Sequence, residues 1–390
     1  MLSSKKTIAI LGSTGSIGTT SLNILKSHKK KFKINLLCCN KNKIQIHKQI
    51  KTYLPKFVII NDLKTYNFFL NIDFKKKIKF FKNIEEFDRY NKKIKNKFDK
   101  TILGISSIDG LKYAFSFMKY SKEILIANKE SIVCGGKYLL NEAKKYSCKI
   151  ISIDSEHFCL ANTLKFFKLN QIKKIYLTAS GGPFLDKNKN EISKIDSRFA
   201  LKHPNWKMGK KISIDSATMA NKGLEVIEAS ILFDIDPKKI GVKIHKESKV
   251  HSVVTLFNGL VYLVAHNTSM KIPISNSLLD NYRQNINNNF FDNKSFSFTF
   301  DEKKLNNFKM LSLAYKSLQH GQRACIFYNV INDHLVNLYL QKKIFFYEIH
   351  YKLNKIMLNK KLFYYFRKKI ININDIYQTI SMAQYYAKKI

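Results

Sequence analysis

Residues 7–18 read T-I-A-I-L-G-S-T-G-S-I-G, and this stretch decides the fold. A short apolar run, typical of a buried strand, leads directly into glycines at positions 12, 15 and 18, and a plausible helix follows through Leu25. Glycines at this spacing permit a tight turn, a close approach of the backbone to a pyrophosphate, and close packing of the helix on the strand. The stretch predicts a dinucleotide site, with a purely structural glycine turn as the alternative.

The pattern of apolar residues changes twice along the chain. Up to about residue 148, short apolar runs alternate with longer mixed stretches, and we expect parallel strands at residues 7–11, 34–39, 57–60, 100–103 and 123–127. A turn-rich middle region, from about residue 149 to 300, opens with a strand at residues 149–153 and adds strand-like runs at residues 174–178, 249–257 and 260–265. After about residue 301, apolar residues recur at helical spacing, first in Phe308, Leu311, Tyr315 and Leu318 and later in Ile376, Ile380, Ala383 and Ala387.

The expected fold class is α/β, and the 390 residues suggest two or three domains. We expect a Rossmann-like domain with a parallel sheet over residues 1–150. A central α/β catalytic domain with a mobile loop follows over residues 151–300, and a small helical domain over residues 301–390.

The chain is strongly basic, with 69 Lys and Arg against 28 Asp and Glu, a net charge of +41, yet 45% of its residues are apolar and can fill real cores. Nucleic acid or an anionic membrane is the usual partner of such a surface. Only five of the cations are arginine, the residue usually preferred for reading phosphates and bases. We interpret the lysines as the filling of solvated positions, and we expect no nucleic-acid partner and no membrane partner.

The six cysteines indicate a reducing compartment, because they show neither C-x-x-C spacing nor intervals with histidine that would suit zinc. The first residues lack the pattern of a signal peptide, and no apolar run approaches the roughly 18 residues that span a bilayer. The expected location is the cytoplasm.

The end of the second expected strand bears on the choice of dinucleotide. Asn40-Lys41-Asn42-Lys43 stands roughly where an acid would hold the ribose hydroxyls of NAD. No acid stands there, and lysine and asparagine suit a 2′-phosphate. The sequence therefore predicts NADPH in preference to NADH.

Two polar clusters follow in the middle region. In Asp154-Ser155-Glu156, just beyond the strand at 149–153, extended backbone would turn both carboxylates to one side, toward one hard cation. Acid-x-acid pairs also occur at Glu86/Asp88 and Asp234/Asp236, so spacing alone leaves open whether this is a metal site.

The second cluster covers Lys202–Gly209 and Ser213–Glu228 and includes Trp206, the only tryptophan, with Pro204, Gly209 and Gly223 expected in loops. Its Ser216, Asn221 and Lys222 offer a hydroxyl, an amide and an ammonium that suit a phosphate, and Ser180-Gly181-Gly182 is another candidate anion loop. A polar turn with a helix cap, and a tryptophan that only packs, remain the alternatives for each piece taken singly.

Six motifs appear in order along the chain: G-S-T-G-S-I-G at 12–18, A-N-K-E-S at 127–131, D-S-E-H at 154–157, S-G-G-P-F at 180–184, H-P-N-W-x-M-G-x-K-I-S-x-D-S-A-T-M-x-N-K-G-L-E at 203–225, and V-H-S-V-V at 250–254. Together they make the chain resemble the 1-deoxy-D-xylulose 5-phosphate reductoisomerases, NADPH-dependent enzymes of the methylerythritol phosphate route to isoprenoids. The resemblance covers nearly the whole length and is strongest from about residue 125 to 270.

The resemblance implies a set of cofactor and metal residues. For the dinucleotide they are Thr14, Gly15, Ser16, Ile17, Asn40, Lys41, Asn42, Asn128, Glu130 and Gly209. For Mg²⁺ or Mn²⁺ they are Asp154, Glu156 and Glu225, all hard oxygen donors as these ions require. The third carboxylate is one that spacing could not reveal.

The resemblance also implies a phosphorylated sugar substrate and a homodimer. Lys129, Ser155 and Glu156 would meet the hydroxyl and carbonyl end of the substrate, with Lys129 as a proton donor or a balancing charge. Its phosphate would be held by Ser180, Ser216, Asn221 and Lys222, with His203 and Trp206 on a loop that closes over it. The implied reaction is an isomerisation of 1-deoxy-D-xylulose 5-phosphate followed by hydride reduction to 2-C-methyl-D-erythritol 4-phosphate.

Three positions depart from the family pattern: Asn40 where glycine is common, Gly104-Ile105-Ser106-Ser107 in place of a G-A-A-G-like run, and Lys202 in place of arginine. None of them touches the carboxylates or the phosphate set.

Other functions fit less of the sequence. A short-chain dehydrogenase would need Y-x-x-x-K after the cofactor half, and that pattern occurs only in the Lys- and Tyr-rich tail between Tyr339 and Lys389, at about the frequency expected by chance. A semialdehyde-type dehydrogenase would need an activated cysteine, and none has an activating context. A nonspecific nucleic-acid binder would explain the charge but not the carboxylates.

Overall fold

The computed structural model of the protein describes residues 5–72, 74, 78–187, 191–192, 195–201, 206, 209–280, 286, 290, 297–302 and 308–390. The chain divides into two compact units. The first consists of Met1–Ser131, Leu139–Asp154 and Met270–Asn285, and the second of Ile132–Tyr138, Ser155–Ser269 and Ile286–Ile390. The three domains expected from the sequence stay a prediction.

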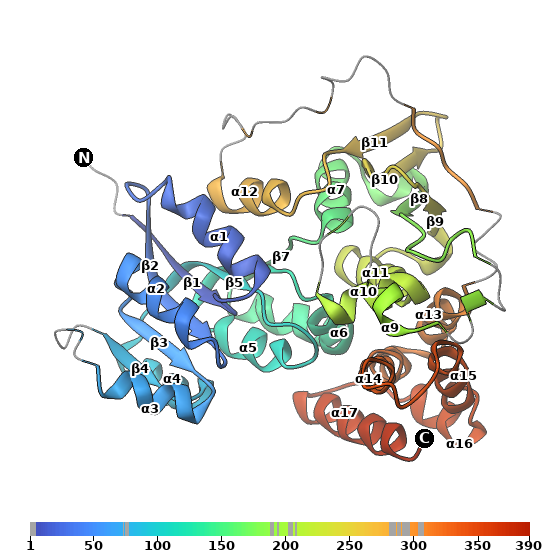
Figure 1. Ribbon diagram of the computed structural model, residues 1–390. Helices are drawn as coiled ribbons and strands as arrows, with labels where there is room; N and C mark the ends of the chain where they lie inside the picture. Colours follow the sequence, from blue (N-terminus) through green and yellow to red (C-terminus); the bar gives the residue numbers. More distant parts are fainter. Residues whose placement is uncertain are drawn as a thin grey trace. The chain divides into compact units, whose positions relative to one another are not determined.

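A sheet of seven parallel strands organises the first unit, in the order β4-β3-β2-β1-β5-β6-β7 (Figure 1). The strands are β1 (Lys6–Leu11), β2 (Phe32–Cys39), β3 (Phe57–Ile60), β4 (Lys79–Phe81), β5 (Phe98–Leu103), β6 (Ser121–Ile126) and β7 (Lys149–Ser152). The helices are α1 (Ser16–Lys26), α2 (Lys43–Tyr53), α3 (Leu63–Leu70), α4 (Ile84–Ile94), α5 (Gly110–Phe117), α6 (Lys129–Lys145, shared with the second unit) and α12 (Lys271–Leu279). This arrangement confirms the α/β class and the Rossmann-like sheet.

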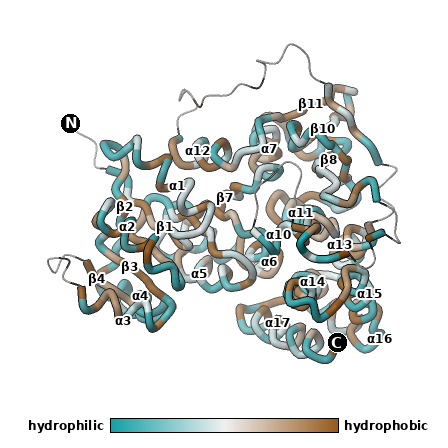
Figure 2. The backbone as a smooth tube through the Cα atoms, in the orientation of Figure 1, coloured by the Kyte–Doolittle hydropathy of each residue, from teal (hydrophilic) through white to brown (hydrophobic). Residues whose placement is uncertain are grey.

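The central strands are apolar without alternation because both faces of the sheet are covered. Residues 8–11 of β1 and 57–60 of β3 are all buried, and these strands lie in brown, hydrophobic stretches of Figure 2. Helix α12 comes from far along the chain and is fixed to β5, because the buried Lys100 ammonium donates to Ser277 O at 2.7 Å and pairs with Asp280.

The second unit is built on a mixed four-stranded sheet in the order β11-β10-β8-β9. Strands β8 (Ile172–Ala179) and β9 (Ile240–Ile244) are parallel, while β10 (Val250–Leu256) pairs antiparallel with β8 and with β11 (Val261–Ala265). The helices are α7 (Ser155–Leu164), η1 (Leu169–Gln171), α9 (Ser197–Ala200), α10 (Lys210–Thr218), α11 (Ala220–Phe233), η2 (Pro237–Lys239), α13 (Lys309–His320), α14 (Gln322–Leu340), α15 (Phe346–Met357), α16 (Lys360–Phe366) and α17 (Ile373–Lys388).

The helical spacing at the C-terminal end is confirmed. Leu311 on α13 is buried, and Ile376, Ile380, Ala383 and Ala387 all lie on the buried face of α17. The described part of the chain holds no helix that combines the length and the apolar character needed to cross a bilayer.

All nine strands expected from the sequence are present, with ends that differ by one or two residues. Strands β4 and β9 were not predicted. The expectation that Gly223 lies in a loop is wrong, because it lies inside α11. A β-carbon at Gly223 would stand 2.7 Å from the Tyr328 hydroxyl and 2.8 Å from Ala314 Cβ, so glycine serves close packing of helices there.

Candidate active site

The glycine-rich turn has the geometry of a dinucleotide site. Gly12 has a φ of +81°, and a β-carbon there would stand 2.8 Å from the Gly104 carbonyl. Helix α1 begins at Ser16, and its N-cap is Gly15, so no side chain covers the first N–H groups of the helix. Thr14, Gly15, Ser16 and Ile17 thus surround a free helix start, which favours an anion.

The loop after β2 presents Asn40, Lys41 and Asn42 at the surface. The Asn42 side chain caps α2 by accepting from Gln45 N at 3.1 Å, which fixes the turn that carries Lys41. An acid, Asp62, follows the end of the neighbouring strand β3. Its carboxylate accepts hydrogen bonds from Thr65 N at 2.8 Å and from Thr65 Oγ1 at 2.7 Å. These two hydrogen bonds lower the pKa of Asp62 and hold its carboxylate on α3.

Asn128 ties two loops of the first unit together. Its Oδ1 accepts from Ser131 N at 2.8 Å and so caps α6, and its amide donates to Ser107 O at 2.5 Å and also to Ile105 O. Asn128 therefore holds the backbone of residues 104–107, the segment whose sequence departs from the family pattern. Glu130 lies in the first turn of α6, while Gly209 belongs to the second unit, where it is the N-cap of α10.

The expectation of an extended backbone through Asp154-Ser155-Glu156 is wrong. Helix α7 begins at Ser155, so Glu156 lies in its first turn, where a carboxylate is favoured by the helix dipole. Asp154 is the last residue of the first unit and precedes that helix directly. Asp154 and Glu156 are separated only by Ser155, so the local backbone sets the distance between their carboxylates.

Three carboxylates gather around this helix start. Asp154, Glu156 and Glu225 each offer an oxygen, and these oxygens lie within 4.8 Å of one another. Glu225 comes from α11, which is distant in sequence, and it is 1% exposed. The three hard oxygen donors fit Mg²⁺ or Mn²⁺, which prefer such ligands.

Cationic side chains balance the carboxylates. The buried Lys222 ammonium lies 2.7 Å from Glu156 Oε1 and also pairs with Glu225, and Lys129 Nζ lies 2.9 Å from Asp154 Oδ2. Asn221 Nδ2 donates to Glu225 Oε1 at 2.5 Å. Burial by itself lowers the pKa of Lys222, but the charges of Glu156 and Glu225 outweigh it and raise that pKa. Lys222 is therefore a cation here.

A candidate phosphate corner adjoins this cluster. Gly181 and Gly182 follow Ser180 with φ values of +86° and +68°, and Ser180 Oγ accepts from Gly182 N at 3.2 Å. A β-carbon at Gly182 would stand 2.8 Å from Ser216 O, so the loop after β8 rests on the last turn of α10. The loop that follows Ser180 thus lies against the backbone at Ser216, and Asn221 and Lys222 follow on the next helix.

Two predicted residues lie on the segment between α9 and α10. His203 falls outside the described residues. Trp206 makes an edge-to-face contact with His251 on β10, with ring centroids 6.2 Å apart, and His251 stacks on His266 at 3.8 Å.

Sequence reasoning assigned no role to the side chains behind Glu225. The ring of His157 on α7 hydrogen-bonds Glu225 O through Nε2 at 3.0 Å, and its Nδ1 lies 3.7 Å from Glu228 Oε2. Both side chains are fully buried. The signal was present as the histidine of D-S-E-H and the second glutamate of α11, but only the fold brings them together.

The cysteine alternative finds no support. All six cysteines are buried thiols outside any disulfide, and burial raises the pKa of Cys38 and of Cys148 to about 12. A thiol in that state is a poor nucleophile.

Family models match most of the chain. The model described as 1-deoxy-D-xylulose 5-phosphate reductoisomerase matches residues 8–136. The models of that enzyme's C-terminal domains match residues 150–233 and 266–386.

Relatives and solved structures agree with these models. The 1-deoxy-D-xylulose 5-phosphate reductoisomerase of Pelagibacter ubique is 40% identical and covers 95% of this chain and 96% of its own, and that of Thermoanaerobacter sp. is 38% identical over 88% and 90%. A crystal structure of the reductoisomerase in complex with NADPH, fosmidomycin and magnesium superposes with a TM-score of 0.89 at 29% identity, covering 98% of both chains. The Zymomonas mobilis enzyme in complex with NADPH has a TM-score of 0.85 at 26% identity, covering 99% of both.

Proposed function

This chain belongs to the 1-deoxy-D-xylulose 5-phosphate reductoisomerase family, and we propose that it converts 1-deoxy-D-xylulose 5-phosphate into 2-C-methyl-D-erythritol 4-phosphate at the carboxylate cluster, with NADPH as reductant. The reaction is an isomerisation followed by hydride reduction, in the methylerythritol phosphate pathway.

The observation that carries the proposal is the convergence of three carboxylates. Asp154, Glu156 and Glu225 each offer one oxygen, and these oxygens lie within 4.8 Å of one another. These residues would hold Mg²⁺ or Mn²⁺. When bound, such an ion supplies positive charge beside the substrate oxygens, where negative charge develops as the carbon skeleton rearranges. Three carboxylates held this close need a cation, and Lys222 and Lys129 supply only part of that charge.

The substrate phosphate would lie at Ser180, Ser216, Asn221 and Lys222. The Gly181-Gly182 turn after Ser180 lies against the Ser216 backbone, so the segments that carry both hydroxyls are neighbours. Asn221 and Lys222 lie in the first turn of α11, one turn before Glu225, and so link this corner to the carboxylates. Binding energy from the phosphate would therefore hold the reacting carbons at the cluster.

Lys129 and Ser155 would meet the hydroxyl and carbonyl end of the substrate. The Lys129 ammonium is 5% exposed and lies on the Asp154 carboxylate, so it can balance charge or donate a proton at a site shielded from bulk water. Ser155 Oγ donates to Glu156 Oε2 at 2.5 Å, which orients that carboxylate. Trp206 and His203 would cover the substrate and exclude water.

The first unit would bind NADPH, with its phosphates at the start of α1 and its 2′-phosphate at Asn40, Lys41 and Asn42. Support comes from the start of α1, which no side chain caps, and from the surface position of Lys41. Asn128, Glu130 and Gly209 would complete the cofactor site.

The test is NADPH consumption by the purified protein with 1-deoxy-D-xylulose 5-phosphate and Mg²⁺, comparing the wild type with Asp154→Asn and Glu225→Gln. Each variant should lose at least about a hundredfold in kcat, because each removes a charge beside the reacting oxygens. Glu85→Gln, which alters an exposed acid of α4, is the matched control and should be active. Activity in Glu225→Gln close to the wild type would contradict the proposal.

The enzyme would work as a homodimer in the cytoplasm. Strand β11 is an edge strand, and Val261, Tyr262 and Leu263 on it are 51%, 38% and 45% exposed, so a second copy has an apolar edge to cover. Six cysteines outside any disulfide suit a reducing compartment.

Sedimentation equilibrium tests the dimer. Leu263→Lys should shift the protein toward the monomer, whereas Phe345→Lys, at an equally exposed position ahead of α15, should leave its mass unchanged. A wild type that sediments as a monomer at all concentrations would refute the dimer.

A further inference from the structure

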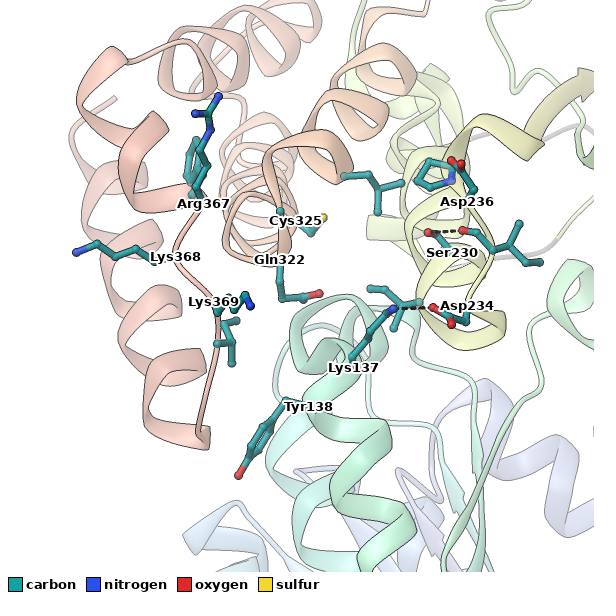
Figure 3. Close-up of a pocket in the computed structure, with 17 residues that line it drawn as sticks. Lys137, Tyr138, Ser230, Asp234, Asp236, Gln322, Cys325, Arg367, Lys368 and Lys369 are labelled. Atoms are coloured by element: carbon teal, nitrogen blue, oxygen red, sulfur yellow. Dashed lines mark hydrogen bonds and ion pairs between the residues drawn. The ribbon is translucent and has the colours of Figure 1, made fainter. Parts of the chain in front are cut away.

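A cavity of about 530 Å³ lies in the second unit and shares no residue with the candidate active site (Figure 3). Its walls come from the middle of α6, the end of α11 with the turn after it, the end of α13, the first turn of α14, and the end of α16 with residues 367–370 after it. The volume falls within the range of small-molecule sites.

One wall is held rigidly by Arg323. This guanidinium is 5% exposed, and it donates from Nε to Lys368 O at 3.1 Å and from an NH2 group to Lys369 O at 3.2 Å. Its other donors reach Tyr365 Oη and Thr379 Oγ1, and it pairs with Asp375 at 3.3 Å. The backbone at 368–369 is therefore fixed by a buried cation, which determines the direction in which each neighbouring lysine leaves the wall.

The two neighbouring lysines differ in direction. In Figure 3 the Lys369 side chain extends from this wall toward Gln322, while Lys368 extends away from the cavity. The Lys368 ammonium lies over the Tyr364 ring, 5.3 Å from its centroid. Among the described residues no carboxylate pairs with Lys369, so its charge is available to a ligand.

Gln322 shapes the opposite side. Its Nε2 donates to Val133 O at 2.5 Å, at the place where α6 is interrupted by Gly136 with a φ of +57°. A β-carbon at Gly136 would overlap the Gln322 side chain, so the glycine makes room for this contact. Gln322 also opens α14, a helix of 19 residues, so positive helix-end charge adds to that of Lys369.

The remaining lining is apolar, and its acids are occupied. Ile231, Ile235, Leu318 and Phe366 contribute hydrocarbon surface. Asp234 pairs with Lys137 at 2.5 Å, and the Asp236 carboxylate accepts from Lys238 N at 2.8 Å. Among the described lining residues, Lys369 is the cation that extends toward Gln322, and it stands beside a polar amide and apolar surface.

We propose that this cavity binds a small organic anion with an apolar body, whose anionic group meets Lys369 at the start of α14. The apolar body would lie against Leu318 and Ile235. This site is independent of the proposed catalytic function, and all its lining residues belong to the second unit.

The test uses two dyes of nearly equal shape. 8-Anilinonaphthalene-1-sulfonate carries an anionic group on an apolar body, and N-phenyl-1-naphthylamine is its neutral counterpart. Both are titrated by fluorescence against the protein with Mg²⁺ and saturating NADPH, so that the cofactor site is filled. Lys369→Gln should weaken sulfonate binding about fivefold and leave the neutral dye unchanged, because one charged contact is lost.

Lys368→Gln is the matched control, since it removes the same charge one residue away, and it should leave both dyes unchanged. Leu318→Trp should fill the cavity and weaken both dyes, with NADPH consumption preserved as the check on folding. Equal weakening by Lys368→Gln and Lys369→Gln would show a general charge effect, and sulfonate binding that survives Leu318→Trp would place the dye elsewhere. Either result would overturn the proposal.

Discussion

The ammonium of Lys222 lies 2.7 Å from Oε1 of Glu156, although 66 residues separate the two in sequence. Lys222 also pairs with Glu225, three residues further along α11. One buried cation thus contacts two of the three carboxylates, and it is also the cation proposed for the substrate phosphate. Charge in the site is therefore shared among Lys222, the divalent ion and the phosphate.

Replacing Lys222 should make the stability of the protein depend more strongly on Mg²⁺. Lys222→Met leaves Glu156 and Glu225 buried without their cation, and we expect the free energy of unfolding to fall by about 3 kcal/mol in the absence of divalent ions. Mg²⁺ should then raise the melting temperature of the variant more than that of the wild type, because the ion binds only the folded cluster.

Lys137→Met provides the control for that experiment. It breaks the ion pair with Asp234, whose side chains are 69% and 76% exposed, and an exposed pair of this kind contributes at most about 1 kcal/mol. An equal response of both variants and the wild type to Mg²⁺ would contradict the charge sharing.

Gly182→Ala should damage the phosphate corner. The position has a φ of +68°, and the new β-carbon would stand 2.8 Å from Ser216 O, so strain and a backbone clash add. We expect a loss of about 3 kcal/mol in the free energy of unfolding and a higher KM for the substrate. Gly259→Ala, at a φ of +88° with no atom near the new β-carbon, carries only the strain and should cost about 1 kcal/mol. Equal losses in urea denaturation would mean that the Ser180 loop does not rest on Ser216.

Much of the first sheet could be predicted because its strands are continuous apolar runs, such as Phe57–Ile60, bounded by polar stretches. Strand β4 was not predicted because it has only three residues, begins with a lysine and lies at the sheet edge. In β9 the alternation of Ile240, Val242 and Ile244 follows directly after a turn and spans only five residues. Short elements of this kind are stabilised by the neighbouring strand rather than by their own pattern.

The candidate site shows the same limit. Spacing identified Asp154 and Glu156 as a pair but assigned them an extended backbone, because a short apolar run does not reveal that a helix begins at Ser155. Glu225 could not be found from spacing at all, since α11 reaches the cluster through tertiary packing. Only the resemblance of motifs brought it forward. His157 and Glu228, which lie behind Glu225, belong to the motif stretches, but only the fold shows that they meet.

His266 should make the folded state sensitive to acid. Burial, together with the nearby charge of His251, lowers the pKa of His266 from its usual value to about 3. The unfolded chain then takes up this proton below about pH 6.5 while the folded chain does not, so stability is present above that pH and is lost as the pH falls toward 3. His266→Phe keeps an aromatic ring against His251 and removes the titration. Urea denaturation from pH 7 to pH 4 should show the wild type losing up to about 1.4 kcal/mol per pH unit more than the variant. Parallel curves would contradict the assignment.

Trp206 should report on its own contact, because it is the only tryptophan of the chain. His251→Ala removes the ring that lies 6.2 Å from the indole, and we expect emission at longer wavelength and stronger quenching by acrylamide. His320→Ala, which removes a stacking partner of Phe363 on the distant helices, should leave the emission unchanged. Unchanged emission in His251→Ala would mean that Trp206 does not rest on β10 in solution.

Lys41 should decide the preference for NADPH. Asn42 holds the turn by capping α2, the neighbouring acid Asp62 is bound to Thr65, and Lys41 is exposed at the strand end where the adenosine ribose of a dinucleotide lies in such folds. Lys41→Ala should lower kcat/KM for NADPH about tenfold and leave kcat/KM for NADH nearly unchanged, because only the former carries the extra phosphate. Lys43→Ala is the matched control, since the Lys43 ammonium lies over the Phe68 ring, 3.2 Å from its centroid, and is therefore turned toward α3. A loss that is equal for both dinucleotides would indicate a fault in the turn rather than a lost phosphate contact, and an equal loss in Lys43→Ala would assign the effect to surface charge in general.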